Sequence, residues 1–431
     1  MEILRGAIFH TPANAFESSS ALHSYTDGAL AIDGGCIVAC GDYAGIREAH
    51  PEAPVRDLRG GFILPGFIDT HIHFPQVRII GGLGYSLLEW LDRLTLPEEA
   101  KLADAGYAGT IAGEFVAALA AHGTTTALVF GSHFAEATAA LFQAAAKSGL
   151  RVIGGLVLAD RGLRPELHQT PDAAYRESRA LIERFHNRGR LGYAVMPRFA
   201  VAASEAMLQT CQALLREDST LRFTTHLNEN PAEIEEVLRL FPWTADYLAV
   251  YERYGLISRR AVLAHNIHTN RSELHRLAWY RASIAHCPCS NAALGSGVFG
   301  MRRHLEGGVP FALGTDVGAG TGFGMMKEAL QAYLMQRILP QPMSLTPAQM
   351  LYLATRAGAE ALALEEETGD FTPGKAADFV YLRAPKASPL EGVLRNAEDP
   401  ERMLSALFTL GGAESVREVR VEGDLVFEAG L

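Results

Sequence analysis

Cysteine is scarce in this sequence, and long uncharged hydrophobic runs are missing. Five cysteines among 431 residues are too few for a disulfide framework, so we expect a reducing compartment, the cytoplasm. No apolar run approaches the roughly 20 residues that a membrane-spanning helix needs. The first residues also lack the basic and apolar regions of a secretory signal. The sequence therefore predicts a soluble cytoplasmic protein that does not bind a membrane.

Positive charge is also in deficit. The 38 Lys and Arg residues are outnumbered by 49 Asp and Glu residues, which gives a formal net charge of -11. Nucleic acid binding releases counterions only where basic residues cluster, so this balance argues against a nucleic acid partner. Hydrophobic residues at 48% and charged residues at 20% are typical of a globular chain and not of a disordered one.

Apolar strand-like stretches alternate with Ala-rich helix-like stretches through the middle of the chain. This alternation is typical of βα units and a parallel sheet. Helical patterns cover 105–121 and 135–148, among others. Eight strand candidates can be placed, the number that a closed (β/α)₈ barrel requires: 67–73, 124–130, 152–158, 192–196, 221–226, 261–266, 283–287 and 311–316.

The two ends of the chain are different from the middle. Near the start, 28–32 and 36–40 flank an Asp-Gly-Gly turn, which indicates a hairpin. Near the end, 377–382 and 416–421 are strand-like too. Neither end is long enough for a good core alone. We therefore predict an α/β protein in which 65–371 form the barrel, while 1–64 and 372–431 together form a small β-sandwich.

Titratable and polar side chains gather where the predicted barrel strands end. His71 and His73 lie two residues apart on one strand and so share one face. Active sites of such barrels lie at the carboxyl ends of the strands, which makes this distribution informative. The other residues at or just beyond strand ends are Gln76, Arg198, Phe199, His226, Glu229, His265, His286 and Asp316.

Four of these residues suit a zinc ion: His71, His73, His226 and Asp316. Three imidazoles and one carboxylate match the preference of zinc for nitrogen and oxygen ligands and leave a place for water. The same ligands tolerate iron. Asp316 is suited to take a proton from that water and Glu229 to give one to a substrate. His265 is suited to stabilise the developing tetrahedral centre.

Several stretches of the sequence resemble the metal motifs of the amidohydrolase superfamily: 65–73, 225–226, 264–265 and 314–316. The fourth strand has no lysine at its end, where two-metal members carry a bridging one, so the resemblance is to the mononuclear, deaminase-type branch. Six stretches resemble guanine deaminases in particular: 69–76 (DTHIHFPQ), 88–91 (LEWL), 197–199 (PRF), 226–230 (HLNEN), 283–288 (SIAHCP) and 314–317 (GTDV).

This resemblance implies a substrate and a set of roles. It implies one zinc ion per chain and hydrolytic deamination of guanine to xanthine and ammonia, as part of purine catabolism. Glu229, His265 and Asp316 would carry out the proton transfers. A homodimer is implied as well. The residues expected to contact guanine are Gln76, Arg198, Phe199, His226, His265 and Asp316.

Departures from the family pattern keep other functions open. Asn228 and Cys289 replace the residues usual at their positions, and 200–203 is less polar than expected. One alternative is a related deaminase or hydrolase that acts on another aminated ring: 8-oxoguanine, an adenosine-type ring or a triazine. A non-catalytic, amidohydrolase-like scaffold is a second alternative, which the complete ligand set disfavours.

Some residues have a plain structural interpretation beside a functional one. His286 could support the site or contact the substrate. The 87–91 segment could be ordinary core packing or a lid. Cys287 and Cys289 are interpreted as buried packing residues. Seven histidines lie off the strand-end pattern and are interpreted as structural or surface residues: His122, His133, His168, His186, His268, His275 and His304.

Overall fold

The computed structural model describes residues 1–430. It contains a parallel barrel, as predicted from the sequence. Each barrel strand pairs with the next in parallel, and β8 (Val157–Leu158) continues the line of the third strand. The strands in order are β5 (Phe67–His73), β6 (Thr124–Phe130), β7 (Arg151–Gly155), β9 (Leu191–Pro197), β10 (Arg222–Leu227), β11 (Ala261–His265), β12 (Ser283–His286) and β13 (Phe311–Leu313).

The barrel closes between its first and last strands. The Asp316 N–H donates to the His71 carbonyl at 2.8 Å, and the His73 N–H donates to the Val317 carbonyl at 3.0 Å. β13 ends at Leu313, earlier than predicted, because the next residues turn onto β5. A Cβ on Gly314 would lie only 2.9 Å from the His71 Cβ atom, so glycine permits this close approach.

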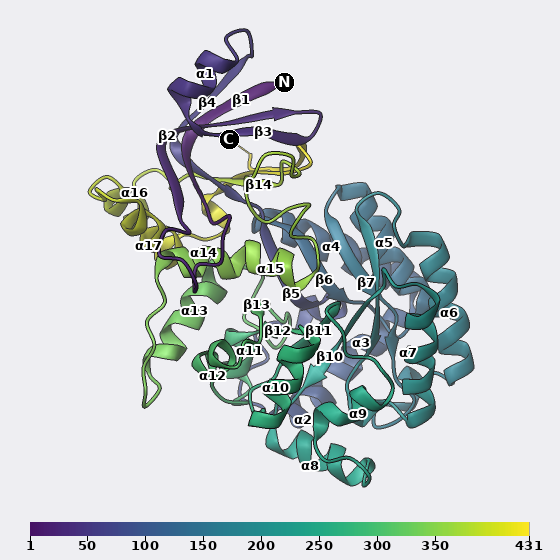
Figure 1. Ribbon diagram of the computed structural model, residues 1–431. Coiled ribbons are helices and arrows are strands. Elements are labelled where there is room, and N and C mark those ends of the chain that lie inside the picture. The colour runs from purple at the N-terminus through teal and green to yellow at the C-terminus, as the bar shows by residue number, and fades with distance from the viewer. Residues whose placement is uncertain (431) are drawn as a thin grey trace.

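Helices follow the strands around the barrel (Figure 1). The predictions at 105–121 and 135–148 are confirmed as α4 and α5. Gly149 caps the end of α5 with φ +83°, a left-handed conformation that glycine adopts with little strain. The longer helices are α4 (Ala105–Ala121), α5 (Ala135–Ser148), α6 (Pro171–Phe185), α7 (Glu205–Glu217), α8 (Pro231–Leu240), α9 (Tyr247–Arg253), α10 (Arg271–Tyr280), α13 (Met325–Arg337) and α14 (Pro347–Ala354).

The other helical segments are short, apart from the 11-residue α17. Before α4 come η1 (Phe74–Ile79), α2 (Leu87–Trp90), the π-helix η2 (Leu91–Thr95), α3 (Leu96–Ala100) and η3 (Lys101–Ala103). The remaining segments are α1 (Tyr43–Ala49), η4 (Pro165–Leu167), η5 (Ala200–Ala202), α11 (Pro288–Ala293), α12 (Met301–Glu306), α15 (Arg356–Ala361), α16 (Pro389–Leu394), α17 (Pro400–Leu410) and η6 (Ala413–Ser415).

Both ends of the chain contribute strands to one seven-stranded sheet, which confirms the prediction that the two ends combine into a β-structure separate from the barrel. The termini accordingly lie together, at the top of Figure 1. β14 pairs antiparallel with β4, with Phe379 opposite Pro65. One hydrophobic cluster combines residues of both ends, including Leu4, Leu30 and Phe379. The strand order is β16 (Asp424–Glu428), β15 (Val416–Val421), β14 (Phe379–Leu382), β4 (Val55–Pro65), β1 (Glu2–His10), β2 (His23–Asp33) and β3 (Cys36–Asp42).

The connection from this sheet to the barrel places the first pair of histidines. β4 ends at Pro65, and β5 begins two residues later at Phe67. All seven residues of β5 are buried, which fits a parallel barrel strand that is covered on both faces. Across residues 1–430, no helix combines the length and apolar character needed to span a membrane.

Candidate active site

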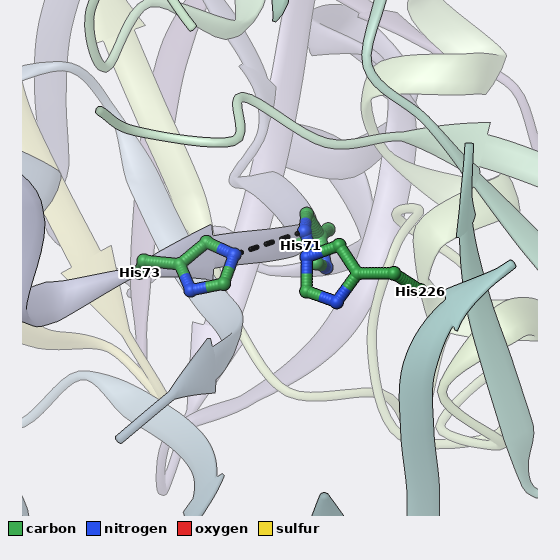
Figure 2. Close-up of side chains that lie close together, drawn as sticks. All are labelled: His71, His73 and His226. Atoms are coloured by element: carbon green, nitrogen blue, oxygen red, sulfur yellow. Dashed lines mark hydrogen bonds between the residues drawn. The ribbon is translucent and has the colours of Figure 1, made fainter. Parts of the chain in front are cut away.

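Three histidines converge at the carboxyl ends of the barrel strands (Figure 2). His71 and His73 come from β5 and His226 from β10, so the predicted sharing of one strand face is confirmed. The Nε2 atoms of His71 and His73 are 3.2 Å apart. The His226 Nδ1–H donates to the Arg198 carbonyl at 2.5 Å, which leaves its Nε2 lone pair free for a metal.

Asp316 adds a carboxylate to this group. Its Oδ1 lies 3.3 Å from His71 Nε2 and 3.4 Å from His73 Nε2. Ligand atoms at about 2.1 Å on a tetrahedral zinc ion are about 3.4 Å from one another, so these spacings fit such an ion. The backbone of Asp316 has φ +50°, an uncommon value for a residue other than glycine, although Asp adopts it more readily than most.

Charge states in this cluster also suit a cation. Burial lowers the pKa of His71, and it lowers the pKa of His73 to about 4, so both imidazoles are neutral at pH 7. The pKa of His226 is well below its usual value because of burial and the neighbouring imidazoles. Burial alone would raise the pKa of Asp316, but its contacts with His71 and His73 outweigh this and hold it well down. Neutral imidazoles and an ionised carboxylate are the forms that bind metals.

Asp69 fixes the geometry of the first and last strands, and the sequence did not single it out. Its Oδ1 accepts the His71 and Thr315 N–H groups, both at 3.1 Å. Its Oδ2 accepts the Thr315 hydroxyl at 2.5 Å. This buried carboxylate therefore holds the backbones next to His71 and Asp316 in one arrangement.

Glu229 and His265 lie beside the ligand cluster. The His265 Nε2 atom is 3.5 Å from Glu229 Oε2 and 3.8 Å from Asp316 Oδ2. The His265 Nδ1–H donates to Asn291 Oδ1 at 2.9 Å. Burial, together with the charge of Asp316, raises the pKa of Glu229 to about 8. A carboxyl group that is still protonated at pH 7 is suited to give a proton to a substrate.

The position of Glu229 depends on the start of α8. Asn230 caps this helix, and Glu233 completes a capping box. The Glu233 Oε2 atom accepts the Glu229 N–H at 3.1 Å, and Glu233 Oε1 accepts the Tyr247 hydroxyl at 2.7 Å. The Asn-Pro-Ala-Glu sequence after Glu229 is thus a helix start that also orients the preceding carboxyl group.

A cavity of about 380 Å³, its open mouth included, opens onto these groups. The Phe199 ring contacts His226 edge-on, with ring centroids 6.5 Å apart. All the predicted site residues except His71 line the cavity, and His71 is fully buried behind it. The lining residues among the predictions are His73, Gln76, Arg198, Phe199, His226, Glu229, His265 and Asp316.

The 87–91 segment covers one side of this cavity. Leu87, Trp90 and Leu91 line it, and Trp90 is only 3% exposed. Leu88 points outward and is 45% exposed. The two interpretations of the segment are therefore compatible, because its apolar side chains form a small cluster that is also a wall of the cavity.

Glu99 is a buried residue of the site that the sequence analysis missed. Its carboxylate accepts the Gln76 side-chain amide at 2.8 Å and the Arg198 guanidinium at 2.6 Å. His133 Nε2 lies 3.3 Å from Glu99 Oε2, so this histidine, interpreted from the sequence as a structural or surface residue, is in contact with a residue of the site. Glu98 and Glu99 are adjacent acidic residues in a helical stretch, a pattern typical of a solvated surface, so nothing in the sequence indicates that Glu99 is buried in the site.

His286, Cys287 and Cys289 are buried, and none of them lines the cavity. The His286 ring stacks on Phe299 with centroids 4.4 Å apart. Burial lowers the pKa of His286 to about 3. Cys287 and Cys289 are buried free thiols, as predicted. A supporting role behind the site therefore fits His286 better than substrate contact.

Comparison with known proteins places this geometry in a family. The sequence model of the family described as "Amidohydrolase family" matches residues 62–426. The chain belongs to the amidohydrolase family. A second family model, described as "Imidazolonepropionase-like composite domain, bacteria", matches residues 28–53 in the terminal sheet.

Relatives of this amidohydrolase bear out the resemblance to guanine deaminases. A "Probable guanine deaminase" of Deinococcus radiodurans is 58% identical over 99% of both chains. The guanine deaminase of Escherichia coli is 39% identical over 99% of this chain and 98% of its own. Its solved structure covers both chains completely with a TM-score of 0.96. The guanine deaminase of C. acetobutylicum, solved with bound guanine, is 26% identical with a TM-score of 0.91 and covers 99% of this chain and all of its own.

Proposed function

We propose that this amidohydrolase deaminates guanine to xanthine and ammonia with one zinc ion per chain. The proposal rests on one observation: residues suited to bind a metal ion lie next to residues suited to bind a purine. His71, His73 and Asp316 have the spacing of zinc ligands, and His226 offers a ligand atom within 4.8 Å of those of His71 and His73. This group lies beside a cavity lined by Gln76, Arg198 and Phe199. The names of the full-length relatives, guanine deaminases at 58% and 39% identity, support the same substrate.

The cavity residues match the chemistry of a flat purine. Arg198 supplies donors for a ring carbonyl, and Gln76 supplies a donor and an acceptor for ring nitrogens. Phe199 offers an aromatic face or edge for the ring. These groups would orient guanine so that its amino-bearing C2 atom faces the cluster around Asp316.

The proton transfers follow from the positions of two carboxyl groups. Bound zinc would supply a water molecule that is acidified enough to attack at neutral pH. Asp316, ionised and next to His71 and His73, takes the proton of the attacking water. Glu229, protonated at pH 7, gives a proton to ring nitrogen N3, and the Nε2 atom of His265 hydrogen-bonds the attacking oxygen. Asp316 then passes its proton to the amino group, which leaves as ammonia, and the C2 hydroxyl returns a proton to Glu229 as the new carbonyl of xanthine forms.

Several wider expectations belong to the same proposal. The relatives' common name supports a role in purine metabolism, which we propose for this chain together with a cytoplasmic location and a homodimeric state. Iron is the alternative metal, because the ligand set accepts it as well. We also propose the domain limits stated above, with 65–371 as the catalytic barrel and 1–64 with 372–431 as the accessory module.

Ammonia release by purified, metal-analysed protein tests this function. Guanine, 8-oxoguanine, adenine and cytosine are supplied in parallel, and His71→Ala serves as the metal-site variant. Fast release from guanine alone, about one zinc per chain, and loss of both in His71→Ala are expected. Release from another ring but not from guanine would contradict the substrate, and full activity of His71→Ala would contradict the metal site.

A further inference from the structure

Glu99 joins two substrate-facing residues that come from distant parts of the chain. Gln76 lies in η1 after β5, and Arg198 follows β9. Both side chains bond to the carboxylate of Glu99, which projects from α3. Glu99 is 2% exposed and Arg198 is 3% exposed, so this ion pair is shielded from water and its geometry is correspondingly well defined.

The carboxamide of Gln76 is held at both of its polar atoms. Its Nε2 donates to Glu99 Oε1 at 2.8 Å, and its Oε1 accepts the Gly318 N–H at 3.0 Å. A flipped amide would set oxygen against carboxylate oxygen and N–H against N–H. Glu99 therefore fixes which atom is nitrogen and leaves one N–H and one oxygen lone pair for a ligand.

The guanidinium of Arg198 is divided between Glu99 and the cavity. Nη1 donates to both Glu99 oxygens, at 2.9 and 2.6 Å. Within residues 1–430 these are the side-chain hydrogen bonds recorded for Arg198, so Nη2 and Nε remain for a ligand. The negative charge of Glu99 also offsets the arginine charge next to a cluster that must hold a cation.

We propose that Glu99 is a positioning residue that sets the purine specificity of this site by fixing the polarity of Gln76 and the orientation of Arg198. It does so without touching the substrate itself. The site then accepts a ring that offers an acceptor to the Gln76 N–H, a donor to its free lone pair and a carbonyl to Arg198. This inference rests on the proposed function for its substrate.

The neighbouring Glu98 provides a matched control. It lies on the same short helix and is 5% exposed. Its carboxylate pairs with Lys101 at 2.7 Å and accepts the Tyr107 hydroxyl, away from the cavity. Glu98→Gln and Glu99→Gln thus make the same chemical change at adjacent buried positions, and only Glu99 contacts Gln76 and Arg198.

Steady-state kinetics of these two variants test the inference. In Glu99→Gln we expect KM for guanine to rise about 10- to 100-fold, with kcat within about threefold and zinc content unchanged, because charge-assisted bonds that orient the ring are lost. Glu98→Gln should keep both constants. An unchanged KM in Glu99→Gln, or an equal rise in Glu98→Gln, would overturn the inference.

A double variant separates positioning from general damage. If Glu99 acts through Gln76, adding Glu99→Gln to Gln76→Ala should raise KM less than it does in the wild-type background. Fully additive effects in the logarithm of KM would contradict action through Gln76. Should Glu99→Gln fail to fold, Glu99→Asp keeps the charge on a shorter side chain. It should then raise KM less than Gln76→Ala does, and an unchanged KM there would count against the inference.

The same experiments distinguish this inference from failure of the proposed function. If the wild-type protein deaminates another ring, the proposed substrate is wrong, and the comparison of the two glutamate variants is repeated on that ring. If no ring reacts, the crystal structure of Glu99→Gln decides. Displacement of Arg198 or a flipped Gln76 amide would support the inference, and unchanged side chains would refute it.

Discussion

Removal of the Asp69 carboxylate should destabilise the barrel at its closure and weaken metal binding. Three donors from His71 and Thr315 lose their acceptor in Asp69→Ala and stay buried. At about 1 to 2 kcal/mol for each donor, the free energy of unfolding should fall by about 3 to 6 kcal/mol. Because the same contacts align two metal ligands, the dissociation constant for zinc should rise about 10- to 100-fold.

Urea unfolding and chelator competition would measure these two effects. Both are run at pH 8, above the pKa of about 7 to which burial raises Asp69, and the unfolding is run on metal-free protein. Asp57→Ala is the control, because its carboxylate is exposed on β4 and pairs with Arg59; its effect should stay within about 0.5 kcal/mol. If Asp69→Ala matched this control in urea midpoint and zinc affinity, the account of the barrel closure would be refuted.

Three further outcomes are expected. Glu229→Gln should keep its zinc and lose about 10²- to 10⁴-fold in kcat, since it can no longer give a proton; metal analysis with kinetics checks this, and a normal kcat would exclude that role. Trp90→Ala, which removes a wall of the cavity, should raise KM for guanine about tenfold, and an unchanged KM would show that the wall does not hold the ring. Burial lowers the pKa of His10 to about 4, so below pH 6.5 the unfolded chain binds a proton that the folded chain does not bind until about pH 4. The free energy of unfolding should therefore fall between these values by up to about 3 kcal/mol for this residue, and urea titrations of His10→Gln should show a correspondingly smaller fall.

The barrel was predictable because its signals are local. A buried parallel strand is apolar along its whole length, and β5 and β6 match their predicted limits. The prediction of one strand at 152–158 was less accurate, since the structure contains two strands there, β7 and β8. A Cβ on Gly155 would lie 2.0 Å from the Ala194 carbonyl oxygen. The chain therefore comes unusually close to β9 there, and such a close approach has no signature in the sequence.

The cluster of side chains suited to bind a metal was predictable for the same reason. The residues that hold the site in position, Glu99 and Asp69, were not. Strand ends of a parallel barrel meet at one face, so His71, His226 and Asp316 could be brought together from their positions alone. Glu99 and Asp69 act through contacts between segments far apart in the chain. The direction of an acidic side chain depends on how its helix or strand packs. The residues next to Glu99 and Asp69 in the sequence do not indicate that direction.

The pairing of β14 with β4 also constrains the order in which the chain can be completed during synthesis. β4 is made early, but its partner Phe379–Leu382 follows the whole barrel. Until then one edge of the N-terminal sheet has unpaired N–H and carbonyl groups, a feature that favours wrong association. Asp316 is likewise made long after His71, so the complete ligand set exists only late in synthesis. A ribosome-bound chain that stops before β14 should therefore depend on chaperones. In the finished chain, β14 pairs with the exposed edge of β4.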